Sequence, residues 1–323
     1  MTALLAGYIG GSRVDLAQVR RSKGRISLVN QETFPTSDFS NFDSILKLYL
    51  KKRKTGVAAA CFGVAGPVIR DQVSATNLSW HIAGEDIQKK FSFPRVKLIN
   101  DIVATAHGLS ELDSEKFFTI NEGHKNGHGN IALIAAGSGL GEALIYNDGR
   151  KFHPYASEGG HADFAPHNAL EGELWAYIFS RQGRVEVEDV VSLGGIERIY
   201  QFLVDTQRGV KADWFDNSED RASLIVENAL SGNDENSIAT MDVFIDCYAS
   251  EAANLVLKGM ALGGVYIGGL IAPRIITLLE SGRFMERFVK QGKMTQMLTD
   301  MPVGVIIEEK TALLGAADVA TGL

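Results

Sequence analysis

The residues best suited to chemistry are an amide and a carboxylate, Asn100 and Asp101, which end the apolar run that begins at Val96. An amide beside a carboxylate can hold two hydroxyls of a polyol and leave the carboxylate facing the one that reacts, which is general-base geometry. Asp is also a preferred N-cap residue of helices. On its own, the pair is therefore consistent with either a catalytic or a structural role.

A strand and a helix must position this pair. The run from Val96 predicts a strand that ends at Asn100 and Asp101, and the helix-favouring sequence IVATAHGL that follows predicts a helix. Open α/β sheets bind their ligands at the carboxyl ends of strands. We therefore expect the pair at such a strand end.

Two predicted hairpins place glycines and a hydroxyl after a strand. The first follows the strand candidate Leu4 to Ile9, and the second follows Ile131 to Ala136. Such turns expose backbone N–H groups to a phosphate, although a Gly-Gly hairpin without a ligand has the same pattern. Neither carries the Gly-Lys-Ser/Thr of a Walker loop. The repetition of this hairpin suggests a duplicated architecture with a phosphate bound between its halves.

A third glycine cluster lies in the strand candidate Ala261 to Ile275, where a flat ring could lie against the backbone. The three clusters together supply the predicted nucleotide- and phosphate-binding residues. These are Gly10, Gly11, Ser12, Gly137, Ser138, Gly139, Gly268 and Gly269.

The stretch SEGGHADFAP places two glycines between an acid, Glu158, and an imidazole, His161, which suits sugar hydroxyls. A metal pair would need further His or Cys at ligand spacing, so no metal site is predicted here. Further along, Glu186, Glu188 and Asp189 precede VVSLGG. One of them could face a cleft, but such a charge cluster is also typical of a solvated surface.

Composition narrows the class of protein. The 323 residues carry a net charge of −7, which argues against a nucleic-acid surface. The two cysteines, Cys61 and Cys247, are too few for a disulfide framework, so a reducing cytoplasm is expected. The amino terminus lacks the basic region of a signal peptide, and no apolar run is long enough to span a membrane.

In this order, the pieces resemble the bacterial-type glucokinase family, in the group of sugar kinases with the actin and hexokinase fold. The resemblance covers nearly the whole chain, and its most specific parts are LINDIVATAHGL, SEGGHADFAP and GGVYIGGLIAPRI. It implies an α/β fold of duplicated ribonuclease-H-like domains with a sugar cleft between them. The expected domains are a small one, 1–110 completed by the helix 311–323, and a large one, 111–310.

The resemblance also implies transfer of the γ-phosphoryl group of ATP to the 6-hydroxyl of glucose or a related hexose, with Mg²⁺, in glycolysis. Carried over by position, Asp101 would be the general base and Asn100 would hold neighbouring hydroxyls. Glu158, His161 and Glu188 would bind the other end of the sugar. A homodimer is implied by the same analogy.

The departures from the family lie on the nucleotide side. The first phosphate loop of the family reads Asp-x-Gly-Gly-Thr, whereas this chain has Tyr8 in place of the Asp that is expected to hold Mg²⁺. Glu142, directly after the second loop, adds a negative charge that could partly replace the lost Mg²⁺ partner, although repulsion or an outward-facing side chain is expected instead. The alternative function is therefore a weak or inactive kinase-derived sugar sensor.

Overall fold

The computed structural model describes residues 3–22, 24–53, 56–74, 80–124 and 129–323. The chain forms two compact units. The first comprises Met1–Lys116 with Glu308–Leu323, and the second comprises Phe117–Ile307. Each unit has its own sheet and its own hydrophobic core, so each is described by itself.

The first unit is built on a five-stranded sheet with the order β3-β2-β1-β4-β7. Strands β1, β2 and β3 pair antiparallel, whereas β4 runs parallel to β1 and β7 runs parallel to β4. A separate short hairpin joins β5 and β6. The strands are β1 Ala3–Ile9, β2 Arg13–Ser22, β3 Arg25–Pro35, β4 Val57–Val64, β5 Gln72–Ser74, β6 His81–Ala83 and β7 Val96–Asn100.

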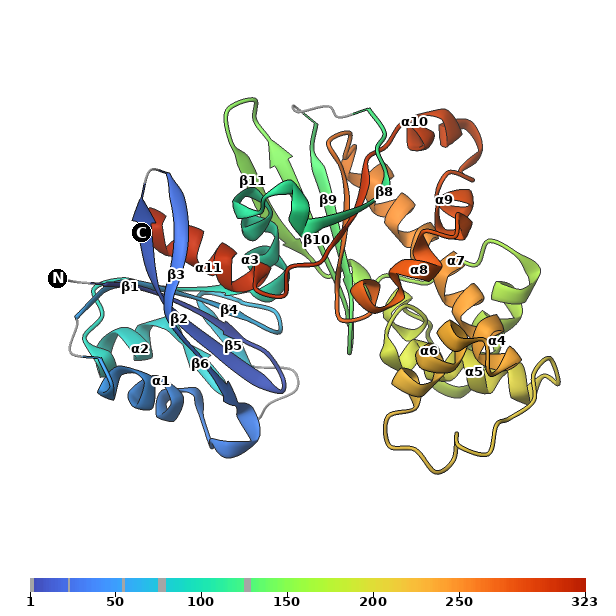
Figure 1. The fold of residues 1–323 in the computed structure, drawn as a ribbon, viewed down its shortest axis with the longest axis horizontal. Coiled ribbons are helices and arrows are strands. Elements are labelled where there is room, and N and C mark those ends of the chain that lie inside the picture. Colours follow the sequence, from blue (N-terminus) through green and yellow to red (C-terminus); the bar gives the residue numbers. More distant parts are fainter. Residues whose placement is uncertain (1–2, 23, 54–55, 75–79, 125–128) are drawn as a thin grey trace. The chain divides into compact units, whose positions relative to one another are not determined.

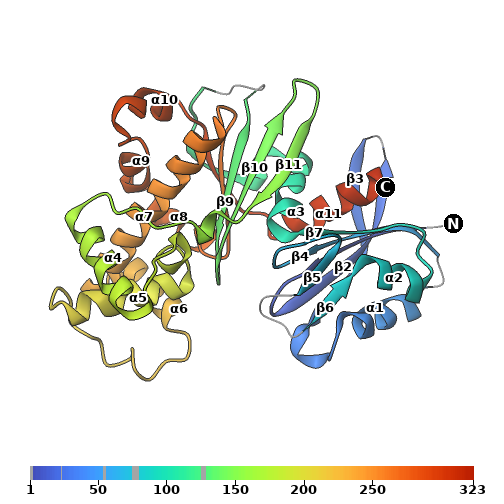
Figure 2. The same cartoon turned by 180° about the vertical axis from the view of Figure 1, so that it is seen from behind.

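Helices cover both faces of this sheet (Figures 1 and 2). On one face, α1 (Phe42–Lys51) and α2 (Gly84–Phe91) bury apolar residues such as Ile45 and Ile87 in the larger core of the unit. On the other face, α11 (Thr311–Gly322) packs small residues such as Ala316 against the strands. The fourth helix, α3 (Asp101–Gly108), lies beside α11.

Small residues let α3 and α11 approach closely. A Cβ added at Gly315 of α11 would stand 1.7 Å from the backbone oxygen of Ala104, and one added at Gly108 would stand 2.1 Å from the backbone oxygen of Thr311. His107 and Asp318 join the same two helices through a 3.2 Å contact between Nδ1 and Oδ2. The C-terminal helix therefore fixes the helix whose first residue is Asp101.

The second unit contains a six-stranded sheet with the order β11-β10-β9-β12-β13-β8. Strands β9, β10 and β11 pair antiparallel, β12 runs parallel to β9, and β13 runs parallel to β12. The edge strand β8 pairs antiparallel with β13. The strands are β8 Phe117–Asn121, β9 Ile131–Ala136, β10 Leu140–Asn147, β11 Phe152–Ser157, β12 Gly264–Gly269 and β13 Val303–Ile306.

A long buried helix organises the rest of the second unit. The helix α7 packs against β9 and is itself contacted by α5, α6 and α9. The apolar side chains of these elements form one continuous core with the sheet. The helices are α4 Ala169–Gln182, α5 Leu193–Asp205, α6 Arg221–Ser231, α7 Glu235–Gly259, α8 Ile276–Leu279, α9 Arg283–Phe288 and α10 Thr295–Thr299.

The two sheets share one pattern of strand directions. In each, an antiparallel three-strand meander leads to two further parallel strands, so that β1, β2, β3, β4 and β7 correspond to β9, β10, β11, β12 and β13. Each predicted glycine turn joins the first two strands of its meander. Among the described residues, no helix is long and apolar enough to cross a membrane.

The close contact between α3 and α11 gives a test of the first unit. We expect Gly315→Ala to lower the free energy of unfolding by about 1–3 kcal/mol, because the new methyl group meets backbone atoms. The control is Gly322→Ala in the same helix, where a Cβ meets nothing within 4 Å. Chemical denaturation measures both variants, and equal stability of the two would contradict this packing.

Candidate active site

The strand-to-helix corner at Asn100 is confirmed: β7 ends at Asn100 and α3 begins at Asp101. The Asn100 side chain caps the helix, because its Oδ1 accepts a 3.0 Å hydrogen bond from the backbone N–H of Ile102. Its Nδ2 donates to the backbone oxygen of Gly66 at 2.9 Å and so ties the turn after β4 to the same corner. The capping role that the sequence allowed for Asp101 thus belongs mainly to Asn100.

Asp101 keeps a carboxylate at the first turn of α3, where the helix N-terminus favours negative charge. Its Oδ1 accepts a 2.9 Å hydrogen bond from the backbone N–H of Ile102. The hydroxyl of Thr105, one turn further along α3, donates a 2.9 Å hydrogen bond to the backbone oxygen of Asp101. The residue is half-buried, so the site constrains the carboxylate without enclosing it.

The first glycine loop lies under a phenol. A Cβ added at Gly10 would stand 2.9 Å from the hydroxyl oxygen of Tyr8, so the ring would have to move to admit a side chain there. The pKa of Tyr8 is raised to about 12, mainly by burial and in part by the Asp101 carboxylate, while Arg13 opposes the rise. The phenol is therefore neutral at physiological pH. Ser12, at the tip of the loop, is exposed.

The second glycine loop is bound to the acid segment of the same unit. The backbone N–H of Leu140 donates to Glu188 Oε2 at 2.7 Å, and a Cβ at Gly139 would stand 2.5 Å from the same oxygen. The backbone oxygen of Gly137 accepts a 2.8 Å hydrogen bond from the N–H of Leu193, the first residue of α5. Ser138, between the two glycines, is exposed.

The third glycine cluster lies beside the second loop. Strands β9 and β12 are parallel neighbours, with Gly268 opposite Ala135 and Gly269 opposite Ala136. Gly269 has a φ of +86°, and a Cβ there would stand 2.2 Å from the backbone oxygen of Ala136, so the position requires glycine. The ends of these two strands therefore form one glycine-lined edge of the second unit.

The turn after β11 carries His161, whose imidazole interacts with several carboxylates. His161 Nδ1 contacts Glu186 Oε2 at 2.7 Å, and this hydrogen bond is the main cause that raises the pKa of His161. The carboxylates of Glu188 and Glu158 raise the pKa further. Both Glu158 and His161 are exposed. The structure thus places the predicted residues Glu158 and Glu188 close enough to His161 for their charges to act on its imidazole.

Glu186 is a functional candidate that the sequence interpretation did not select. Its backbone N–H donates to Asp189 Oδ2 at 2.9 Å, and Gln182 and Arg198 hold Asp189 in turn. The alternation of acids before VVSLGG was visible in the sequence, but the partner of each acid was not.

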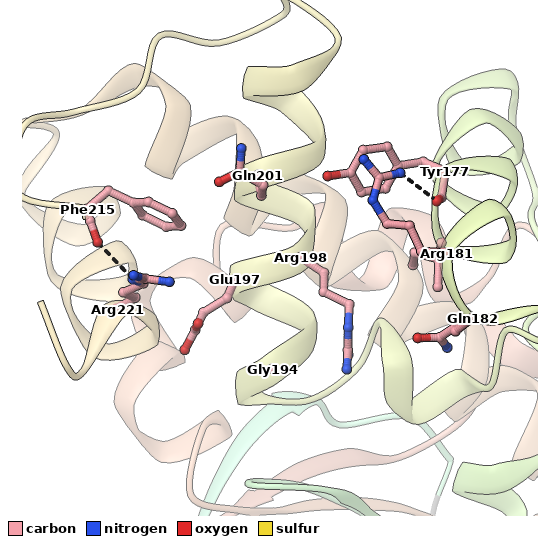
Figure 3. A pocket seen from close by; sticks show the side chains of 10 residues that line it. Tyr177, Arg181, Gln182, Gly194, Glu197, Arg198, Gln201, Phe215 and Arg221 are labelled. Atoms are coloured by element: carbon pink, nitrogen blue, oxygen red, sulfur yellow. Dashed lines mark hydrogen bonds between the residues drawn. The ribbon is translucent and has the colours of Figure 1, made fainter. Parts of the chain in front are cut away.

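Gln182 and Arg198 also line a pocket of about 370 Å³ between α4, α5 and the segment around Phe215 (Figure 3). Aromatic and basic side chains such as Tyr177 and Arg181 form much of its wall. None of the predicted site residues lines this pocket. The pocket is connected to the site only indirectly, because Gln182 and Arg198 in its wall also donate hydrogen bonds to Asp189.

The expectation of an outward-facing side chain at Glu142 is wrong. Glu142 is only 1% exposed. It lies in β10, and its carboxyl is enclosed by Gly159 of the turn after β11 and by the part of α7 that carries Glu251 and Lys258. Burial raises the pKa of its carboxyl to about 8.

The predicted residues fall into two groups by unit. Asn100, Asp101 and the first glycine loop belong to the first unit. The second group, in the other unit, consists of Glu158, His161, Glu188, Gly137, Ser138, Gly139, Gly268 and Gly269. Each group is brought together by its own sheet.

The side chains near the first loop offer few oxygen donors that suit Mg²⁺. Mg²⁺ prefers carboxylate oxygens and water. Tyr8 offers only a neutral phenol, and Asp15, opposite it in the sheet, is engaged by Arg13 at 3.1 Å and by the hydroxyl of Thr33. Among the described residues there is no group of three His, Cys, Asp or Glu side chains that could hold a metal ion. In the part of the chain that the structure describes, the side chains at the first loop therefore do not form a complete Mg²⁺ site by themselves.

Comparison with known proteins gives a consistent result. The glucokinase family model matches residues 5–322. The glucokinase of Trichormus variabilis is 35% identical over 336 residues, covering 98% of each chain. That of a Synechocystis species is 35% identical over 341 residues, covering 97% of this chain and 96% of the relative.

Solved structures agree. The crystal structure of a glucokinase from an Antarctic psychrotroph has a TM-score of 0.86 and 30% identity, with full coverage of both chains. The glucokinase of Balamuthia mandrillaris, crystallised with glucose, has a TM-score of 0.84 at 21% identity, covering 99% of this chain and 94% of the other, which is a likeness of fold.

The mixed α/β fold and these matches define the class of protein as an ATP-dependent hexose kinase. Within that class, the chain belongs to the glucokinase family.

The contact between His161 and Glu186 predicts a pH effect. We expect Glu186→Gln to lower the pKa of His161 towards its ordinary value, because the hydrogen-bonded carboxylate is the main cause of the rise. Glu158→Gln, which removes only a weaker charge interaction, should lower it less. NMR titration of the imidazole measures both variants. An unchanged pKa in Glu186→Gln would show that the contact is absent in solution.

Proposed function

We propose that the chain transfers the γ-phosphoryl group of ATP to the 6-hydroxyl of glucose, with Asp101 as the general base. The observation that carries this proposal is the position of a constrained carboxylate at a strand end, in a chain that matches the glucokinase family over nearly its whole length. The hydroxyl must lose its proton as the new phosphorus–oxygen bond forms, and Asp101 accepts it.

The remaining sugar contacts are assigned to polar groups of both units. Asn100 uses one amide N–H for Gly66, so its second N–H and remaining acceptor capacity are available to a hydroxyl. Glu158 and His161 are exposed and lie on one turn, which supports a role in binding two further hydroxyls. Glu188 either accepts from the sugar or holds the second loop, whose Leu140 N–H it already binds.

The nucleotide is assigned to the glycine turns. Gly137, Ser138 and Gly139 present backbone N–H groups and a hydroxyl that can bind phosphate oxygens. The neighbouring strand end suits the adenosine, because Gly269 is exposed and carries no side chain, whereas Gly268 beside it is buried. Gly10, Gly11 and Ser12 would contact the phosphates from the first unit. ATP binds Mg²⁺ through its own phosphates, and the ion would neutralise their charge during transfer.

Several further assignments rest on the family. The matching strand patterns of the two units support a duplicated ribonuclease-H-like fold, of the kind found in actin and hexokinase, with the units divided near residues 110 and 311. A role in glycolysis, a location in the cytoplasm and a homodimeric state are proposed by the same analogy. A hexose is the proposed substrate class, since relatives of this fold were crystallised with glucose.

The role of Asp101 can be tested by mutation. We expect Asp101→Asn to lower kcat by a factor of at least about 100, because the amide cannot accept the proton, while the affinity for glucose stays within roughly threefold. A coupled assay of glucose 6-phosphate formation and calorimetry of glucose binding measure the two effects. The control is Asp86→Asn in the first turn of α2, which should leave both unchanged. Near wild-type turnover in Asp101→Asn would refute the assignment.

The effect of Tyr8 can be tested in the same assay. We expect Tyr8→Asp to raise activity at low Mg²⁺ by roughly tenfold, because a carboxylate adds a ligand for the ion that a neutral phenol lacks. Tyr8→Phe is the control, since it keeps the ring and removes only the hydroxyl. Thermal unfolding checks that each variant is folded. Unchanged or lower activity in a folded Tyr8→Asp protein would show that Tyr8 does not limit catalysis.

A further inference from the structure

Glu142 is a buried acid that the proposed reaction does not use. Its side chain is 1% exposed, and its Oε1 has no hydrogen-bond partner among the described residues. An unsatisfied buried polar atom costs free energy, so its presence in a folded protein calls for an explanation. The position follows the second glycine loop, in the strand β10, whose other buried residues include Leu140, Ala143 and Ile145.

The carboxyl group lies directly beneath the turn that carries Glu158 and His161. A Cβ added at Gly159 would stand 1.9 Å from Oε2 of Glu142 and 2.7 Å from its Cδ. Gly159 does not have a positive φ, so backbone conformation does not require glycine there. The position needs glycine because the Glu142 carboxyl occupies the space of a side chain. In the ladder, Glu142 is paired with Ser157, the residue that leads into the turn.

Burial and the charge of Glu251 disfavour the ionised form of Glu142, whereas the charge of Lys258 favours it. Glu251 and Lys258 of α7 face it, and Lys258 is paired with Glu251 at 3.2 Å. The buried phenol of Tyr248, on the same helix, also interacts with it. The turn itself contributes Glu158 and His161. Burial is the main cause that raises the pKa of Glu142 to about 8, and the charge of Glu251 adds to the rise.

We propose that Glu142 is a positioning residue for hexose binding, which in its neutral form packs against Gly159 and holds Glu158 and His161 in place. This inference rests on the proposed role of those two residues in binding the sugar. When Glu142 loses its proton, the carboxylate needs water or a cation, and the nearby Lys258 is already paired with Glu251. The side chain then moves or draws in water, and the turn above it shifts. Hexose affinity falls as a result.

The first experiment measures KM for glucose and kcat between pH 7 and pH 9.5 in the wild type and in Glu142→Gln. Gln has the same shape and cannot ionise. In the wild type we expect KM to rise roughly threefold to tenfold above pH 8, with kcat changing less, because the turn binds the sugar and does not contact the transferred group. In Glu142→Gln this rise should be absent. Identical profiles for the two proteins would overturn the proposal.

Two controls make this comparison specific. Glu173→Gln changes an exposed acid of the same unit and should reproduce the wild-type profile. Titration of His161 affects the wild type and Glu142→Gln alike, so it cancels in the comparison. The free energy of unfolding gives a second readout. Because the folded protein holds the Glu142 proton up to about pH 8 and the unfolded chain releases it near 4.5, stability should fall across that range in the wild type and less in Glu142→Gln.

The second experiment is a double-mutant cycle between Glu142 and Gly159. Gly159→Ala should raise KM for glucose by roughly tenfold in the wild type, because its methyl group meets the carboxyl, and by much less in a Glu142→Ala background, which has room for it. Equal effects in the two backgrounds would overturn the proposal.

Glu158→Ala separates this proposal from the proposed function on which it rests. If Glu158→Ala leaves KM unchanged, the sugar assignment itself has failed. If it raises KM while the changes at Glu142 have no effect, only the role of Glu142 has failed.

Discussion

The chemistry proposed for this protein depends on one side chain that joins three segments of the first unit. Asn100 ends a strand, caps the helix that begins at the next residue and holds the backbone of Gly66. These hydrogen bonds leave Asp101 little freedom at the first turn of its helix. A general base must lie within hydrogen-bond reach of the proton that it removes, so this restriction is a condition for catalysis. The close packing of α11 against α3 further restricts the position of this helix.

The second unit positions its groups through acidic side chains that accept hydrogen bonds from backbone N–H groups or bind His161. Glu188 accepts from the second glycine loop, Glu186 binds His161, and Asp189 accepts from the backbone of Glu186. The loop and the turn that are assigned to phosphate and sugar are therefore parts of one hydrogen-bonded group. A ligand that moves any one of these acids would affect both assignments, which gives the unit a physical basis for responding to sugar and nucleotide together.

Much of the local structure could be predicted because it follows from periodicity. The strand candidates Leu4 to Ile9 and Ile131 to Ala136 match β1 and β9, and the strand before Asp101 matches β7. What the sequence could not specify were contacts between distant segments. The pairing of His161 with Glu186 depends on how a turn folds back on a later one. The inward position of Glu142 depends on its packing against Gly159 and near Glu251 of α7, which a local charge pattern does not reveal.

The central claim is that Asp101 is the base towards the 6-hydroxyl of the hexose, and a crystal structure of this protein with glucose tests it most directly. We predict a carboxylate oxygen of Asp101 at about 2.6–3.2 Å from the sugar O6, the range over which a general base reaches its proton directly. Glu158 and His161 should contact hydroxyls of the same sugar. A sugar whose O6 contacts another side chain, with Asp101 beyond hydrogen-bond reach, would contradict the account.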